Sequence, residues 1–91
     1  MDIVQTRSFK NDAKKLYKRQ LNDLEDAIRV IAKDPCVGQM KKGDLNGIRV
    51  YKFSMAKQLT LLAYKFEEDV LQLTLIALGS HENFYRDLKI C

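Results

Sequence analysis

Residues 48–78, IRVYKFSMAKQLTLLAYKFEEDVLQLTLIAL, contain three stretches rich in β-branched, aromatic and leucine residues. Such stretches are typical of strands, and we expect strands over residues 48–54, 59–66 and 70–78. The acidic residues Glu67, Glu68 and Asp69 are expected to form the turn that joins the last two strands as a hairpin. The segment therefore predicts a three-strand antiparallel meander.

The third expected strand alternates in a way that indicates one fully buried side. One face carries Leu71, Leu73, Leu75 and Ala77. The other face carries Val70, Gln72, Thr74, Ile76 and Leu78. This alternation predicts a strand at the centre of the sheet. Tyr64, in the strand before it, is expected in the core.

Upstream of the meander, the pattern changes from strands to a loop and then to helices. Residues 34–47 hold the only proline and three of the four glycines, which is typical of a connecting loop. Before this loop, apolar residues recur at helical spacing from Phe9 onwards. Ser8 is a candidate N-cap, and Asn22 and Asp23 are possible caps for a break, so we expect two helices packed as a hairpin. Residues 3–6 can form a short opening strand.

Downstream of the meander, Gly79 is expected to end the last strand. Ser80 can cap a final helix, with Glu82 well placed in its first turn. The expected fold is therefore an α+β, two-layer domain spanning residues 1–91. It has an N-terminal strand, a two-helix hairpin, a three-strand antiparallel meander and a short C-terminal helix, with the second sheet face partly open.

Length and composition limit the class of protein. With 91 residues, 46% of them hydrophobic, the chain can form a single core. No apolar run approaches the roughly 20 residues that cross a bilayer, and the N-terminus lacks the features of a signal peptide, so we expect a cytoplasmic protein without membrane contact. Cys36 and Cys91 are far apart, and we interpret both as reduced thiols rather than metal ligands.

The charges are segregated along the chain. Residues 7–19 contain six basic residues against the single acid Asp12, and residues 41–65 contain six against Asp44. Acidic residues gather instead at 23–26 and 67–69. This segregation favours a basic face that binds phosphates, and solvated helix charges are an equally good explanation for the first cluster.

His81 is the only histidine, and the sequence contains no phosphate-binding glycine loop and no zinc-ligand spacing. The partial positive charge at the start of the expected terminal helix disfavours the imidazolium form. A neutral ring there could accept a proton as a general base. The alternative is a surface histidine beside a helix cap.

Three segments resemble one known family. ALGSHENFY at 77–85 follows two strands and a turn, and it resembles the C-terminal signature of RelE/ParE superfamily toxins. TRSFK at 6–10 resembles the start of the family's first helix, and KGDLNGIRV at 42–50 resembles the glycine-led start of its sheet. These segments are spread from residue 6 to residue 85, so the resemblance extends over nearly the whole chain.

The resemblance implies the toxin of a type II toxin-antitoxin system, most consistent with a ribosome-dependent endoribonuclease that cuts mRNA and arrests translation. In such members the 2′-hydroxyl of the RNA attacks the adjacent phosphate, without a metal or other cofactor. The catalytic residues implied by position are His81, Tyr85 and Lys52. Because His81 is alone, the second proton transfer would fall to Tyr85, a lysine or Glu82. The substrate-binding residues implied by position are Arg49, Lys57 and Arg86.

The same residues have simpler explanations. Tyr85 could dock the last helix on the sheet, Lys52 and Lys57 could be solvated strand residues, and Arg86 could be a helix-surface charge. Two other functions also stay open: a ParE-like toxin that inhibits DNA gyrase without cutting RNA, and a purely regulatory partner. Either toxin interpretation implies a cognate antitoxin. The nuclease adds the ribosome and mRNA as partners, with DNA contacted only through a toxin-antitoxin repressor complex.

Overall fold

The computed structural model describes residues 1–41 and 47–80. Their elements, in chain order, are β1 (Asp2–Gln5), α1 (Arg7–Lys14), α2 (Lys18–Lys33), β2 (Gln39–Met40), β3 (Arg49–Met55), β4 (Gln58–Glu67), the 3-10 turn η2 (Glu68–Val70) and β5 (Gln72–Ser80). The strands form one sheet in the order β1-β5-β4-β3-β2. β1 pairs with β5 in parallel, and the other pairs are antiparallel.

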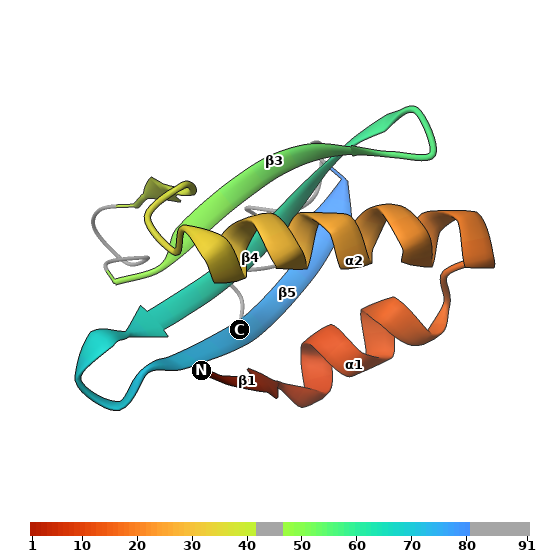
Figure 1. The fold of residues 1–91 in the computed structure, drawn as a ribbon. Coiled ribbons are helices and arrows are strands. Elements are labelled where there is room, and N and C mark those ends of the chain that lie inside the picture. The colour runs from red at the N-terminus through yellow and green to blue at the C-terminus, as the bar shows by residue number, and fades with distance from the viewer. Residues whose placement is uncertain (42–46, 81–91) are drawn as a thin grey trace.

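Both helices cover the same face of this sheet, with α1 over β5 and α2 over β3 (Figure 1). The layer between them is a core of buried apolar side chains. It includes Phe9, Leu24, Ile31, Leu62, Tyr64, Leu73 and Leu75. The expected α+β architecture is therefore confirmed, including the N-terminal strand, the helical hairpin and the meander.

The helix boundaries differ from the expected ones. Thr6, not Ser8, caps α1: its Oγ1 accepts a hydrogen bond from the Phe9 N–H at 3.2 Å. The break between the helices lies at residues 15–17, not at Asn22 or Asp23. Asp23 lies inside α2, where its carboxylate accepts the Ala56 N–H of the β3–β4 turn at 2.8 Å. A residue that looks like a helix cap in the sequence is used here to bind another element.

The alternation expected for the last strand is interrupted by a β-bulge. Tyr64 pairs with Leu75, whereas Ala63 pairs with Ala77, so Ile76 is the extra residue of β5. After the bulge the faces exchange, and Leu78 rather than Ala77 joins the core under the helices. β5 also continues through Gly79 to Ser80, and it is an inner strand beside the central β4.

Two other features of the sheet were not expected. The strand β2 extends its far edge, and Val70 and Leu71 belong to the turn before β5, where both are exposed. Leu71 adopts the left-handed conformation with φ 49°. The turn therefore includes two residues that the sequence pattern assigned to the last strand.

The second sheet face was expected to be partly open. Its centre is closed, because Val50, Leu61 and Ala63 are buried and form a separate apolar cluster. Lys52 and Lys65, which share this face by strand alternation, are exposed. The expected C-terminal helix lies outside the described residues.

The two candidate caps of α1 give a test of this fold. Thr6 Oγ1 also donates to the Ile76 carbonyl at 2.8 Å, so it joins the helix start to the bulge. We expect Thr6→Val to lower the free energy of unfolding by about 1–2 kcal/mol, because it removes both the cap and this bond. Ser8→Ala should change it by less than about 0.5 kcal/mol. Urea unfolding monitored by circular dichroism measures both, and a larger decrease for Ser8→Ala would contradict the observed cap.

Candidate nucleic-acid interface

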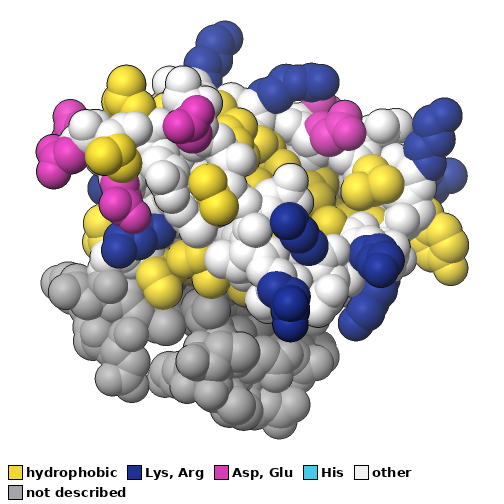
Figure 2. Space-filling view, turned by 90° about the horizontal axis from the view of Figure 1, so that it is seen from below, with side chains coloured by type: hydrophobic (Ala, Val, Ile, Leu, Met, Phe, Trp, Pro, Cys, Tyr) yellow, Lys and Arg dark blue, Asp and Glu magenta, His cyan; other side chains and the backbone are white. Residues whose placement is uncertain are grey.

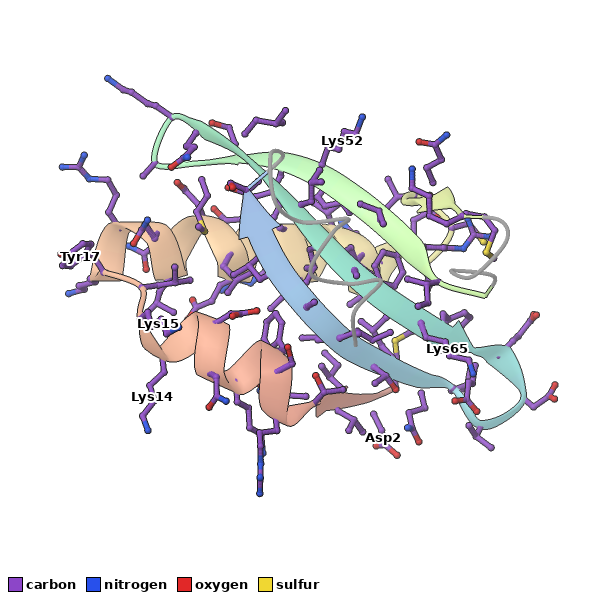
Figure 3. All side chains as sticks on the ribbon, turned by 180° about the vertical axis from the view of Figure 1, so that it is seen from behind. Asp2, Lys14, Lys15, Tyr17, Lys52 and Lys65 are labelled. Carbon is purple, nitrogen blue, oxygen red and sulfur yellow. The ribbon has the colours of Figure 1, made fainter. Side chains whose placement is uncertain are left out.

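Lys52 is the predicted site residue whose position best suits contact with a phosphate. It lies in the middle of β3 on the second sheet face, and its side chain is exposed. Figure 3 shows it extending away from the sheet. A shallow groove of about 260 Å³ lies beside it, lined by Val37, Gln39, Val50, Tyr51 and Lys52. An ammonium group at the edge of a groove can approach a bound anion without losing all of its hydration.

The register of the sheet connects Lys52 with the end of β5. Lys52 pairs with Leu61 on β4, and Leu61 pairs with Gly79 on β5. Because neighbouring strands are about 4.8 Å apart, the Cα atoms of Lys52 and Gly79 are separated by roughly 10 Å. Gly79 is two residues before His81 in the chain.

Arg49 lies on the other face of β3 and is not brought together with Lys52. One of its guanidinium nitrogens donates to the Gly38 carbonyl at 2.9 Å and approaches the Cys36 carbonyl at 3.4 Å. The side chain therefore holds the loop that follows α2. No sequence pattern signals this use of Arg49, because the bond joins residues far apart in the chain.

Tyr64 fixes the same loop from inside the core. Its buried hydroxyl donates to the Pro35 carbonyl at 2.6 Å and accepts the Gly38 N–H at 2.9 Å. A Cβ on Gly38 would lie only 2.7 Å from the Tyr64 hydroxyl oxygen, so this position requires glycine. The expectation of a core position for Tyr64 is confirmed, but its role as a clamp was missed. A tyrosine in an otherwise apolar strand is the signal, since a buried hydroxyl needs a partner.

Burial has a clear effect on this phenol. It raises the pKa of Tyr64 above its ordinary value of 10.0, while the Gly38 N–H and the nearby Arg49 charge lower the pKa by smaller amounts. The phenol is therefore held in its neutral, donating form. As a result, the loop that supplies Val37 to the groove and leads into β2 has a fixed position beside Lys52.

The remaining predicted residues lie apart from this groove or outside the described residues. Lys57 is exposed in the two-residue turn between β3 and β4, where its φ is 70°. His81, Tyr85 and Arg86 lie outside the residues that the structure describes. Within residues 1–41 and 47–80, no three acidic, cysteine or histidine side chains gather as metal ligands do. No helix in that part of the chain is long and apolar enough to span a membrane.

Nearly the whole chain matches one known protein family. Residues 3–89 match the model of a family described as the ParE-like toxin of type II bacterial toxin-antitoxin systems. No curated protein sequence matches the chain.

Solved structures with low sequence identity share the fold. The YoeB/ParE toxin from Agrobacterium tumefaciens has a TM-score of 0.75 at 22% identity, with 89% of this chain and 99% of that chain covered. A chain of the RelBE2 toxin-antitoxin complex from Mycobacterium tuberculosis has a TM-score of 0.74 at 18% identity, covering 88% and 90%. A chain of the intact E. coli RelBE toxin-antitoxin complex has a TM-score of 0.71 at 15% identity, covering 89% and 96%.

Removing the Tyr64 hydroxyl tests the clamp on the loop. We expect Tyr64→Phe to lower the free energy of unfolding by about 1–3 kcal/mol, because the Gly38 N–H and the Pro35 carbonyl lose their partner. Tyr51→Phe is the control, since the half-buried Tyr51 hydroxyl has no hydrogen-bond partner in the described part of the chain. Urea denaturation at neutral pH measures both, and equal effects would contradict the clamp.

The raised pKa of Tyr64 predicts how stability depends on alkaline pH. The folded protein holds the phenol proton more tightly than the unfolded chain. This contribution to stability is complete below pH 10 and is lost as the pH rises through the folded pKa. We expect urea midpoints above pH 10 to fall more steeply for the wild type than for Tyr64→Phe. Parallel curves for the two proteins would show that Tyr64 does not carry the effect.

Proposed function

Because this chain belongs to the family of ParE-like toxins of type II bacterial toxin-antitoxin systems, we propose that it is a ribosome-dependent endoribonuclease that cuts mRNA and arrests translation. One observation carries the proposal. Exposed Lys52 lies in the same cross-strand row as Gly79, so a cation lies roughly 10 Å from the residue that is two positions before His81 in the chain. A phosphate between the two positions would meet both electrostatic stabilisation and a proton-transfer group.

In the proposed reaction, the 2′-hydroxyl oxygen of the RNA attacks the adjacent phosphorus and the bond to the 5′ oxygen breaks. A base takes the 2′ proton, and an acid returns a proton to the departing oxygen. The products are a 2′,3′-cyclic phosphate and a 5′-hydroxyl end. No water molecule is consumed in this step.

We assign one of the two proton transfers to His81 and stabilisation of the crowded phosphate to Lys52. Tyr85 stacks on a base or orients the substrate, and Lys57 and Arg86 contact neighbouring phosphates. Arg49 is left out of the substrate contacts in this proposal, because its guanidinium is used on the loop carbonyls. The attacking hydroxyl belongs to the RNA, so the proposal requires no metal or other cofactor.

The proposed partners are the ribosome with its mRNA and a cognate antitoxin. Two similar chains come from toxin-antitoxin complexes, which supports an antitoxin for this chain as well. An acidic, partly disordered antitoxin would suit a protein with net charge +4. DNA would then be contacted only by the complex of the two proteins.

The second candidate function is inhibition of DNA gyrase without RNA cleavage. The family description, which names ParE, is the observation that favours it. Such a toxin would act through its surface and would not depend on proton transfer by His81. The two functions therefore differ in what a single substitution does.

Substitution of His81 separates proton transfer from binding. We expect His81→Ala to lower the rate of mRNA cleavage on isolated ribosomes by about two to four orders of magnitude, the usual size of a general acid-base contribution. Binding to ribosomes, measured by co-sedimentation, should stay nearly unchanged. A folded His81→Ala protein that cuts mRNA and arrests growth as the wild type does would disprove the proposed mechanism.

Lys52 and Lys65 form a matched pair, because both are exposed on the second sheet face. We expect Lys52→Ala to lower the cleavage rate about 100- to 1000-fold, as removal of a group that stabilises transition-state charge does. Lys65→Ala removes the same charge and should change the rate by less than about threefold. Primer extension on a ribosome-bound transcript gives both rates. Equal decreases would mean that only overall charge matters, which would refute the assignment of Lys52.

A further inference from the structure

The connection between α1 and α2 presents an unusual aromatic side chain. Tyr17 is 79% exposed, the highest value among the large hydrophobic residues of the described chain. Figure 3 shows it at one end of the molecule, pointing away from the sheet. An exposed hydrophobic residue is ordinary by itself, so its surroundings decide whether it has a use.

The backbone beneath this ring is held in place. The Tyr17 N–H donates to Gln20 Oε1 at 2.9 Å, and the Tyr17 carbonyl accepts the Leu21 N–H at 2.9 Å. Leu16, the preceding residue, packs against the core below the helices. The ring is therefore presented on a fixed turn, which reduces the entropy cost when it binds a partner.

The residues on either side of Tyr17 in the chain are mostly basic. Lys14, Lys15, Lys18 and Arg19 flank Tyr17, and Figure 2 shows basic side chains gathered over this end of the molecule. Asp12, the one acid of residues 7–19, is directed to the sheet, where its carboxylate accepts the Leu78 N–H at 3.2 Å. Within the described residues, the one ion pair is Arg29–Asp26, so these four cations have no acidic partner there.

We propose that Lys14, Lys15, Tyr17, Lys18 and Arg19, here called the basic tip, bind single-stranded RNA. Tyr17 stacks on an unpaired base, and the four cations contact the phosphates on either side of it. Stacking of a base on an aromatic ring within a positively charged surface is the general mode of single-strand binding. The proposed contact is separate from the groove beside Lys52, because the helices and Lys52 lie on opposite faces of the sheet.

The pattern of exposed side chains favours RNA over an acidic protein. A protein interface needs an apolar centre formed by several residues. From Gln5 to Arg29, Tyr17 is the sole exposed large hydrophobic residue. A single ring among cations is too little for such a centre, but it is enough to stack one base. The connection between the two helices also lies at one end of the molecule, as Figure 1 shows.

Fluorescence anisotropy with the full chain and a labelled single-stranded RNA of about ten nucleotides tests the proposal. We expect Tyr17→Ala to weaken binding roughly 5- to 150-fold, and Tyr17→Phe, which keeps the ring, to bind within about twofold of the wild type. Binding to an RNA duplex of the same sequence should be insensitive to Tyr17→Ala, because its bases are already stacked. Thermal melting checks that each variant is folded.

A charge series completes the test. A plot of log affinity against log salt concentration has a negative slope, and each phosphate that a lysine neutralises adds about 0.7 to its magnitude. Replacing Lys14, Lys15 and Lys18 with glutamine should therefore reduce the magnitude of this slope by about 2. Lys33→Gln, an exposed lysine in the last turn of α2, is the control and should leave the slope unchanged. Unchanged single-strand affinity in Tyr17→Ala would overturn the proposal. The proposal would also be overturned if a polyglutamate peptide bound the wild type more tightly than the RNA does, and bound the triple lysine variant more weakly than it binds the wild type.

These measurements record binding and not cleavage. The basic tip would stand if the chain bound RNA here but failed to cut mRNA. Loss of cleavage in the Lys52 or His81 variants with normal binding at the tip would likewise leave the two sites independent.

Discussion

The structure depends on the burial of the central strand β4 on both of its faces. Four consecutive residues, Leu61 to Tyr64, are each 0% exposed. Because side chains alternate across a strand, a buried run of this kind requires cover on both sides of the sheet. The helical hairpin provides the cover over Leu62 and Tyr64, and a second apolar cluster surrounds Leu61 and Ala63. Lys52 and Lys65 lie outside this cluster on the second face, where a polar partner can reach them.

The bulge at Ile76 determines which residue at the end of β5 lies in the same cross-strand row as Lys52. Without the extra residue, strict alternation would direct position 79 toward the helices. With it, Leu78 enters the core and Gly79 lies in the row of Lys52. The Thr6 hydroxyl donates to the Ile76 carbonyl, so the start of α1 stabilises this exchange of faces. A helix cap, a bulge and the proposed site are thus connected by one side chain.

The order of elements and the single helical layer could be predicted from the sequence, because hydrophobic period and turn residues report local conformation. The bulge could not, since Ile76 is apolar and fits either face. The prediction of Asp23 as a possible helix cap was wrong for a related reason, because Asp23 lies inside α2 and binds the distant Ala56 N–H. The bond from Arg49 to the Gly38 carbonyl also joins separate segments, so the sequence could not predict it. Lys52 could be predicted as an exposed strand cation, whereas its row with Gly79 depends on the sheet register.

Mapping of the 5′ ends of cellular transcripts, with plasmid supercoiling assayed in the same cells, tests the central claim most directly. The protein is expressed alone for a few minutes before RNA is extracted. The nuclease account predicts new 5′-hydroxyl ends within translated regions while plasmid supercoiling stays normal. Relaxed plasmids and no new transcript ends would contradict it and would favour gyrase as the target.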